Sequence, residues 1–195
     1  GHVLKQSLFY KIRQKEKGRY GFYMNEDLLV MSKITKIYPN GVMANDKVDF
    51  SVKAGEIHAL MGENGAGKST LMNILYGEHQ PEEGAVYLEG RKIKITSPND
   101  AIAHGIGMVH QHFMLVPSLS VAQNIYLGKE PRKNGLIDTK MMIKQAEEIA
   151  EKYNFKILCT ARVAEIPVGM KQKVEILKAL AGGAKILILD EPTAV

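Results

Sequence analysis

The chain has 195 residues, enough for one hydrophobic core or for a core with a small subdomain. Its hydrophobic content of 45% is ordinary for a globular protein, and no apolar run approaches the roughly 20 residues that span a bilayer, so we expect any membrane association to be indirect. The single cysteine, Cys159, excludes an internal disulfide framework and is typical of a reducing compartment.

The net charge of +5 is concentrated at one end of the sequence. Residues 1–23 carry six lysines or arginines and one acid, so they hold the whole excess and the rest of the chain is neutral. The folded part therefore offers no sign of a nucleic-acid surface. Because Met24 resembles a natural start, we expect residues 1–23 to be a basic extension outside the fold, with a membrane-surface arm as the alternative. Residues 24–195 would form the folded domain.

From Leu28 the sequence predicts alternating strands and helices. Two strands, 28–37 and 42–52, meet at the turn signal Tyr38-Pro39-Asn40-Gly41. Apolar runs, helical spacing and capping signals predict further strands at 57–61, 85–88, 106–109 and 186–189, and helices at 69–76, 97–104, 120–127, 139–153 and 168–181. The range 128–135 is predicted to be a polar loop. The block from about 115 to 178 is mainly helical, which indicates a helical subdomain inserted in an α/β chain.

A glycine-rich loop lies between the strand 57–61 and the helix 69–76. Its residues fit the phosphate-loop pattern: Gly62, Glu63, Asn64, Gly65, Ala66, Gly67, Lys68, Ser69 and Thr70. Glycines let successive N–H groups converge on one anion, the helix start adds its positive dipole end, and Lys68 adds a full charge. Ser69 is placed to give its hydroxyl to Mg²⁺. A chance match is the alternative, and the flanking strand and helix argue against it.

A second group of site residues ends the strand 186–189. Four aliphatic residues are followed by Asp190 and Glu191, which is typical of a central parallel strand with acids at its carboxyl end, where ligands bind in α/β sheets. Adjacent strand residues point to opposite faces, so we expect one acid to hold Mg²⁺ and the other to face the γ-phosphate and the attacking water. The alternative without a function is a pair of surface acids that ends a strand.

The ordered set of motifs over about residues 28–195 resembles the ATP-binding cassette (ABC) ATPases. The resemblance implies a P-loop α/β fold with an N-terminal antiparallel β portion and a helical subdomain, and ATP and Mg²⁺ as ligands. It implies that Tyr38 stacks on adenine, that Gln111 contacts Mg²⁺ and couples to the membrane subunit, and that Asp190 is the Walker B aspartate. Glu191 would polarise the attacking water, with Lys68 and Gln111 also in the catalytic set. A turn aromatic and a solvated loop residue are the alternatives for Tyr38 and Gln111.

The signature loop departs from the family pattern. It reads Ile166, Pro167, Val168, Gly169 and Met170, where the family begins with Leu-Ser. Pro167 removes a hydroxyl that would contact the γ-phosphate of the opposing domain, and losing one such donor costs roughly 10²–10³ in rate. The family's D-loop and switch-histidine segments are absent, so we expect a fragment of a longer ATPase.

These observations predict an ATP-hydrolysing subunit that energises an importer for nucleosides or simple sugars. The segment 168–178 and the ending 190–195 resemble the first cassette of tandem importer ATPases, and 108–115 resembles the nucleoside branch. The resemblance implies permease subunits and a second ATPase domain as partners, no nucleic acid, and a peripheral location on the cytoplasmic face of the membrane. The alternatives are a gating module that binds nucleotide with little hydrolysis, which Pro167 favours, and a soluble cassette acting on nucleic acid or ribosomes.

Overall fold

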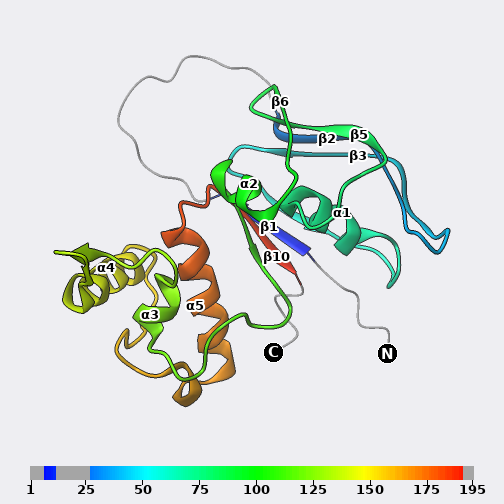
Figure 1. Ribbon diagram of the computed structural model, residues 1–195. Coiled ribbons are helices and arrows are strands. Elements are labelled where there is room, and N and C mark those ends of the chain that lie inside the picture. Colours follow the sequence, from blue (N-terminus) through cyan, green and yellow to red (C-terminus); the bar gives the residue numbers. More distant parts are fainter. Residues whose placement is uncertain (1–6, 12–26, 191–195) are drawn as a thin grey trace. The chain divides into compact units, whose positions relative to one another are not determined.

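The computed structural model describes residues 7–11 and 27–190, which divide into two compact units (Figure 1). The first unit takes in the described residues of 1–108 together with 185–190, and the second takes in residues 109–184. Each unit has a hydrophobic core of its own. The two units are therefore described one at a time.

The first unit contains an antiparallel sheet with the strand order β3-β2-β5-β6. Its strands are β2 (Asp27–Ile37), β3 (Met43–Lys53), β5 (Glu83–Leu88) and β6 (Arg91–Ile93). The turn signal at Tyr38 joins β2 to β3, since the Tyr38 N–H donates to the Val42 carbonyl at 2.8 Å and the Gly41 N–H donates to the Tyr38 carbonyl at 2.8 Å. The predicted antiparallel β portion is confirmed, and β6 is an additional strand.

A second sheet of the first unit has the order β4-β1-β10-β7. Its strands are β4 (Ile57–Leu60), β1 (Ser7–Lys11), β10 (Ile186–Asp190) and β7 (Ile106–Val109). Strand β1 is antiparallel to both β4 and β10, so β4 and β10 run parallel to each other. As predicted, β10 is an interior strand, and its four aliphatic residues are buried. Its neighbour β1 runs antiparallel to it, however, whereas the sequence predicted a parallel strand.

The position of β1 differs from the expectation that residues 1–23 lie outside the fold. Five of these residues form the strand between β4 and β10, while residues 1–6 and 12–23 lie outside the described part of the chain. The strand contains Leu8, Phe9 and Tyr10, an apolar and aromatic run with strand propensity. Five residues are too few to show a period, and nothing local indicates which strands such a run will join.

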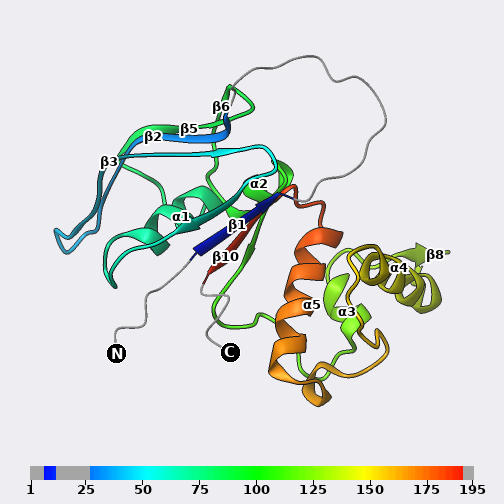
Figure 2. The same ribbon diagram turned by 180° about the vertical axis from the view of Figure 1, so that it is seen from behind.

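Helix α1 lies between the two sheets (Figures 1 and 2). It spans Lys68–Tyr76 and buries Leu71, Met72, Ile74 and Leu75 in the core, together with apolar residues of β2, β7 and β10. The short helix α2 (Pro98–Ala103) begins at Ser97, whose hydroxyl accepts the Asp100 N–H at 3.3 Å. Helix α1, which follows the glycine loop, is thus fixed by packing in the core of the first unit.

The second unit is a helical cluster made of α3 (Val121–Ile125), α4 (Thr139–Lys152), the 3₁₀ turn η1 (Val163–Glu165) and α5 (Val168–Ala181). Helix α3 begins with a capping box between Ser120 and Gln123. The three helices share a core that includes Val121, Met142 and Leu177. The expected helices are confirmed, although α3 is shorter than the predicted range 120–127.

The predicted polar loop at 128–135 is partly wrong. Strands β8 (Arg132–Lys133) and β9 (Leu136–Ile137) form a hairpin, with Arg132 opposite Ile137 and Lys133 opposite Leu136. The two residues at its tip, Asn134 and Gly135, both have positive φ, 52° and 81°, as a two-residue hairpin turn requires. No helix among the described residues has the length and hydropathy needed to cross a bilayer.

Candidate nucleotide site

The phosphate loop, residues 62–70, joins β4 to α1. Gly65 and Gly67 have φ angles of +85° and +80°, a left-handed conformation that only glycine adopts at low cost. The Ala66 N–H donates to the Glu63 carbonyl at 3.2 Å, and the Leu71 N–H donates to the Gly67 carbonyl at 2.9 Å. The loop therefore turns tightly and enters α1 directly, with the helix start at the end of the loop.

Gly67 is also required by a close approach of strand β3. A Cβ atom at this position would collide with the Ala44 carbonyl oxygen and lie 2.7 Å from Asn45 Nδ2. Asn45 is buried, and its Nδ2 donates to the Gly67 carbonyl at 3.2 Å. The antiparallel sheet thus holds the loop from one side at the point where α1 begins.

Lys68 carries the principal charge of the loop. Its side chain is 8% exposed, and Nζ donates to the carbonyl oxygens of Gly62 and Glu63, each at 2.7 Å. Within residues 7–11 and 27–190, no carboxylate forms an ion pair with it. A buried cation without a countercharge is costly, and an ammonium group has three donors, of which these carbonyls use two. The loop therefore favours an anionic ligand.

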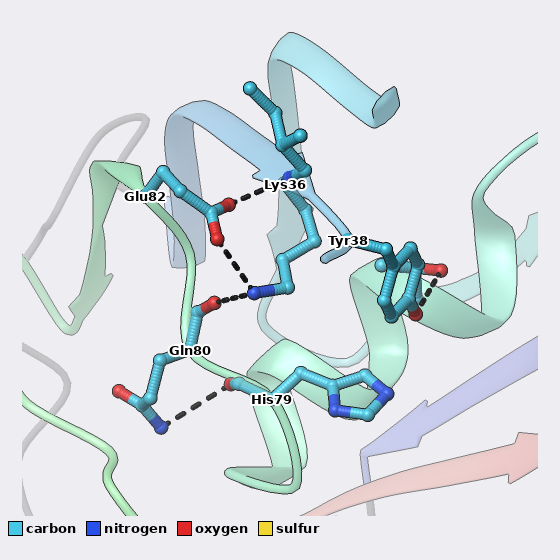
Figure 3. A network of polar contacts seen from close by, with 7 residues as sticks. Lys36, Tyr38, His79, Gln80 and Glu82 are labelled. Atoms are coloured by element: carbon cyan, nitrogen blue, oxygen red, sulfur yellow. Dashed lines mark hydrogen bonds and ion pairs between the residues drawn. The ribbon is translucent and has the colours of Figure 1, made fainter. Parts of the chain in front are cut away.

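Tyr38, the expected adenine-stacking residue, lies beside the first turn of α1 (Figure 3). Its hydroxyl is 3.0 Å from Thr70 Oγ1, and either atom can donate in this bond. The rings of Tyr38 and His79 meet edge to face, with centroids 5.6 Å apart and planes at 89°. Lys36 Nζ lies 5.9 Å from the centroid of the Tyr38 ring. The structure therefore brings Tyr38 and the phosphate loop together.

The end of β2 just before Tyr38 is anchored by Lys36 and Glu82 (Figure 3). Lys36 Nζ donates to Glu82 Oε1 at 2.8 Å and to the Gln80 carbonyl at 2.7 Å, and the Ile37 N–H donates to Glu82 Oε2 at 2.7 Å. The Lys36 hydrogen bond, followed by that from the Ile37 N–H, lowers the pKa of Glu82 below its usual range. These contacts fix the backbone on which Tyr38 is carried.

Asp190 ends strand β10 at the same edge of the sheet as the start of the loop. Ser7 of β1 pairs with Leu60 at the end of β4 on one side and with Asp190 on the other. Because neighbouring strands lie about 4.8 Å apart, the backbones of Leu60 and Asp190 are roughly 10 Å apart. The structure therefore brings Asp190 to the loop side of the sheet. Glu191 lies outside the described residues.

The remaining predicted site residues belong to the second unit. Gln111 follows β7, and the signature residues 166–170 form the start of α5. Pro167 is the N-cap of α5 and makes no side-chain capping bond, but its carbonyl accepts the N–H groups of Met170 and Lys171 at 2.9 and 3.1 Å. The helix start is thus intact although the hydroxyl of the family pattern is missing.

Sequence reasoning missed a connection inside this second unit. Glu175 on α5 is buried, and its carboxylate accepts the Met114 N–H at 2.6 Å, while Lys178 Nζ donates to the Met114 carbonyl at 3.2 Å. Both backbone groups of Met114, three residues after Gln111, are therefore bound by α5. The spacing of Glu175 and Lys178 places them on one helix face, but nothing in the sequence pairs that face with Met114.

A glycine loop that enters a helix, a buried lysine, and an acid at the end of a parallel strand of the same sheet define a phosphate-loop nucleotide-binding fold of the α/β class. The chain belongs to the ABC transporter family, because the sequence model of this family matches residues 45–194. It is 55% identical over 170 residues to the guanosine import ATP-binding protein NupO of Bacillus subtilis, covering 87% of this chain and 33% of that protein.

Two further relatives are import ATP-binding proteins that are named for different cargo. Identity is 52% to the nucleoside import ATP-binding protein NupA of Lactococcus lactis, covering 88% of this chain and 34% of the relative. Identity is 47% to the ribose import ATP-binding protein RbsA 1 of Streptomyces avermitilis, covering 87% of this chain and 32% of the relative. The chain thus spans about a third of the length of these relatives.

Solved structures of cassettes share the fold. The structure of cbiO1 from Clostridium perfringens, part of the ABC transporter complex cbiONQ, matches with a TM-score of 0.69 and 26% identity, over 87% of this chain and 67% of that one. The ADP conformation of MJ1267, an ATP-binding cassette of an ABC transporter, matches with a TM-score of 0.66 and 27% identity. This match covers 83% of this chain and 67% of the MJ1267 chain. The predicted fold class and family are therefore confirmed.

Proposed function

We propose that this chain is the ATP-binding and ATP-hydrolysing cassette of an importer and that the imported compounds are nucleosides. The buried, carbonyl-bound ammonium of Lys68 carries the proposal, since it lacks a carboxylate partner in the described part of the chain and lies in a loop where Gly67 has no room for a side chain. Such a site suits the terminal phosphates of a nucleotide.

The residues of the chain divide the work of phosphoryl transfer between them. The backbone N–H groups of residues 62–70 and Lys68 hold the phosphates, and Tyr38, anchored from three sides, supports the adenine ring. Ser69, Asp190 and Gln111 would hold Mg²⁺, which supplies neutralisation of phosphate charge when bound. Glu191 orients the attacking water. Catalysis is then mainly positioning and electrostatic stabilisation.

The residues present fit a Mg²⁺ ion that is bound through the nucleotide. Among the described residues, no three His, Cys, Asp or Glu side chains gather closely enough to hold a metal ion. Mg²⁺ commonly uses one or two carboxylates together with substrate phosphates, and Asp190 with the Ser69 hydroxyl provides such a set. We expect metal affinity to depend strongly on nucleotide for this reason.

The family and the relatives support a proposal for the partners and the cargo. Residues 166–170 would face the nucleotide of a second ATPase domain, and permease subunits would hold the pair at the cytoplasmic face of the membrane. Both relatives named for nucleoside or guanosine import are above 50% identity, whereas the ribose relative is at 47%, which supports nucleosides over simple sugars. A nucleoside-dependent rise in the ATPase rate of the assembled transporter, absent with ribose, would test the cargo.

Nucleotide binding by the chain tests the proposal directly. We expect Lys68→Met to weaken ATP binding on the order of 100-fold, because a charge-assisted hydrogen bond contributes up to about 3 kcal/mol. Lys92→Met, at an exposed position of β6, is the matched control and should bind normally. Titration calorimetry with Mg–ATP measures both. Equal affinity of Lys68→Met and the unaltered chain would refute the site.

A further inference from the structure

The β8–β9 hairpin exposes large aliphatic side chains beside the start of α4. Leu136 is 76% exposed and Ile137 is 53% exposed, and Met141 in the first turn of α4 is 43% exposed. Figure 2 shows β8 beyond α4, on the side of this helix away from α3 and α5. These side chains therefore take no part in the core of the second unit.

Lysines surround these aliphatic side chains. A shallow hollow of about 560 Å³ is lined by Leu136, Ile137 and Met141 together with Lys133, Lys140 and Lys144, and we name these six residues the hairpin patch. All three lysines are exposed.

The acids near the patch do not cancel its charge. Asp138, which also lines the hollow, accepts the Met141 N–H at 2.9 Å as the N-cap of α4, and it leaves an excess of two positive charges over the lining residues. Glu148 lies 3.8 Å from Lys144, and both groups are well exposed to solvent, so this pair is weak. The patch therefore combines apolar surface with positive potential.

The chemistry of the patch fits lipid better than protein. Protein interfaces concentrate their binding energy in tryptophan, tyrosine and arginine and are depleted in lysine. The lining of the hollow has no aromatic ring and no arginine, but three lysines and three long aliphatic chains. Lysines beside exposed leucine or isoleucine are the combination by which proteins bind anionic bilayer surfaces.

We propose that the hairpin patch binds an anionic membrane surface. The ammonium groups of Lys133, Lys140 and Lys144 contact lipid phosphates, and Leu136 and Ile137 enter the region between headgroups and acyl chains. Each lysine near an anionic bilayer strengthens binding about fivefold, so the contact is reversible and salt-sensitive. The inference does not depend on nucleotide binding and stands or falls separately from it.

Vesicle flotation of the full chain tests this contact. We expect binding to phosphatidylcholine vesicles that contain phosphatidylglycerol, at least about tenfold weaker binding to phosphatidylcholine alone, and a decrease as salt rises. The double variant Lys133→Gln/Lys140→Gln should bind roughly 25-fold more weakly. The double variant Leu136→Ser/Ile137→Ser should also lose binding. Leu158→Ser is the matched control, because Leu158 is 66% exposed in the same unit but outside the patch.

Three outcomes would overturn the proposal. The first is equal binding to both vesicle types. The second is that the patch variants bind as the unaltered chain does, whereas glutamine at Arg13, Lys15, Lys17 and Arg19 together, which leaves β1 in place, abolishes binding; this would assign the binding to the basic N-terminal segment. The third is that the patch variants keep vesicle binding but lose co-purification with permease subunits, which would assign the patch to a protein partner. Circular dichroism of every variant verifies folding.

Discussion

Replacing Gly67 by alanine should destabilise the chain much more than the same change at Gly65. Both glycines have left-handed φ angles, so both variants carry the strain of a Cβ in that conformation, about 1–2 kcal/mol. Only Gly67 is also in close contact. Its new Cβ would meet the Ala44 carbonyl and Asn45, whereas a Cβ at Gly65 has no neighbour within 4 Å.

The additional cost at Gly67 has two parts. Moving the loop away from β3 breaks the hydrogen bond from Asn45 Nδ2 to the Gly67 carbonyl, worth roughly 1 kcal/mol. Displacing packed backbone to admit a methyl group costs about 1–3 kcal/mol more. We therefore expect Gly65→Ala to lose about 1–2 kcal/mol of unfolding free energy, and Gly67→Ala to lose at least about 2 kcal/mol beyond that.

Unfolding by urea or by heat in the absence of nucleotide measures these losses of unfolding free energy apart from any effect on phosphate binding. For a chain of this size each kcal/mol shifts the thermal midpoint by about 2–4 °C, so the two variants should differ by roughly 4–8 °C or more. Equal losses for both variants would show that strand β3 does not press on the loop. In that case the glycine requirement at 67 would be a matter of backbone conformation alone.

Three other predictions concern side chains away from the phosphate loop. Glu82→Gln should lower the thermal midpoint at pH 7, because Lys36 lowers the pKa of Glu82 in the folded chain. The stabilising contribution of this carboxylate is complete above the ordinary value of about 4.3 and decreases as the pH falls toward and through the lowered one, so the effect of the substitution should shrink in acid. An undiminished effect at low pH would contradict this. Burial raises the pKa of the Cys159 thiol to about 11. At pH 8, Ellman's reagent should therefore react with Cys159 ~100-fold more slowly in the folded chain than in the chain unfolded by urea. Similar rates would show that the thiol is not buried. Asn124→Ala should lower the free energy of unfolding, measured in urea, by about 3 kcal/mol, because the buried Asn124 amide forms hydrogen bonds with four backbone groups. A loss below about 1 kcal/mol would be inconsistent with that network.

The sequence predicted the parts of the site that are local in the chain. Residues 62–70 could be located because the glycine loop, the preceding strand and the following helix are contiguous, and each has its own signal. Asp190 could be located because a buried strand ends at it. The roles of Gln111, Glu191 and residues 166–170 stay predictions, because they depend on a partner domain and a bound nucleotide.

The contacts around Tyr38 could not be predicted in the same way. Its partners Thr70 and His79 lie more than 30 residues further along the chain, and no pattern in one sequence pairs them. The β8–β9 hairpin is a different case. Asn134-Gly135 between Lys133 and Leu136 is a strong hairpin signal that the polar composition of the surrounding loop obscured.

The attachment of Met114 to α5 has a mechanical consequence for the second unit. Because Glu175 and Lys178 bind both backbone groups of Met114, the stretch of chain just after Gln111 can move away from helix α5 only if both hydrogen bonds break. We therefore expect a displacement at one of these two places to be transmitted to the other as long as both hydrogen bonds hold.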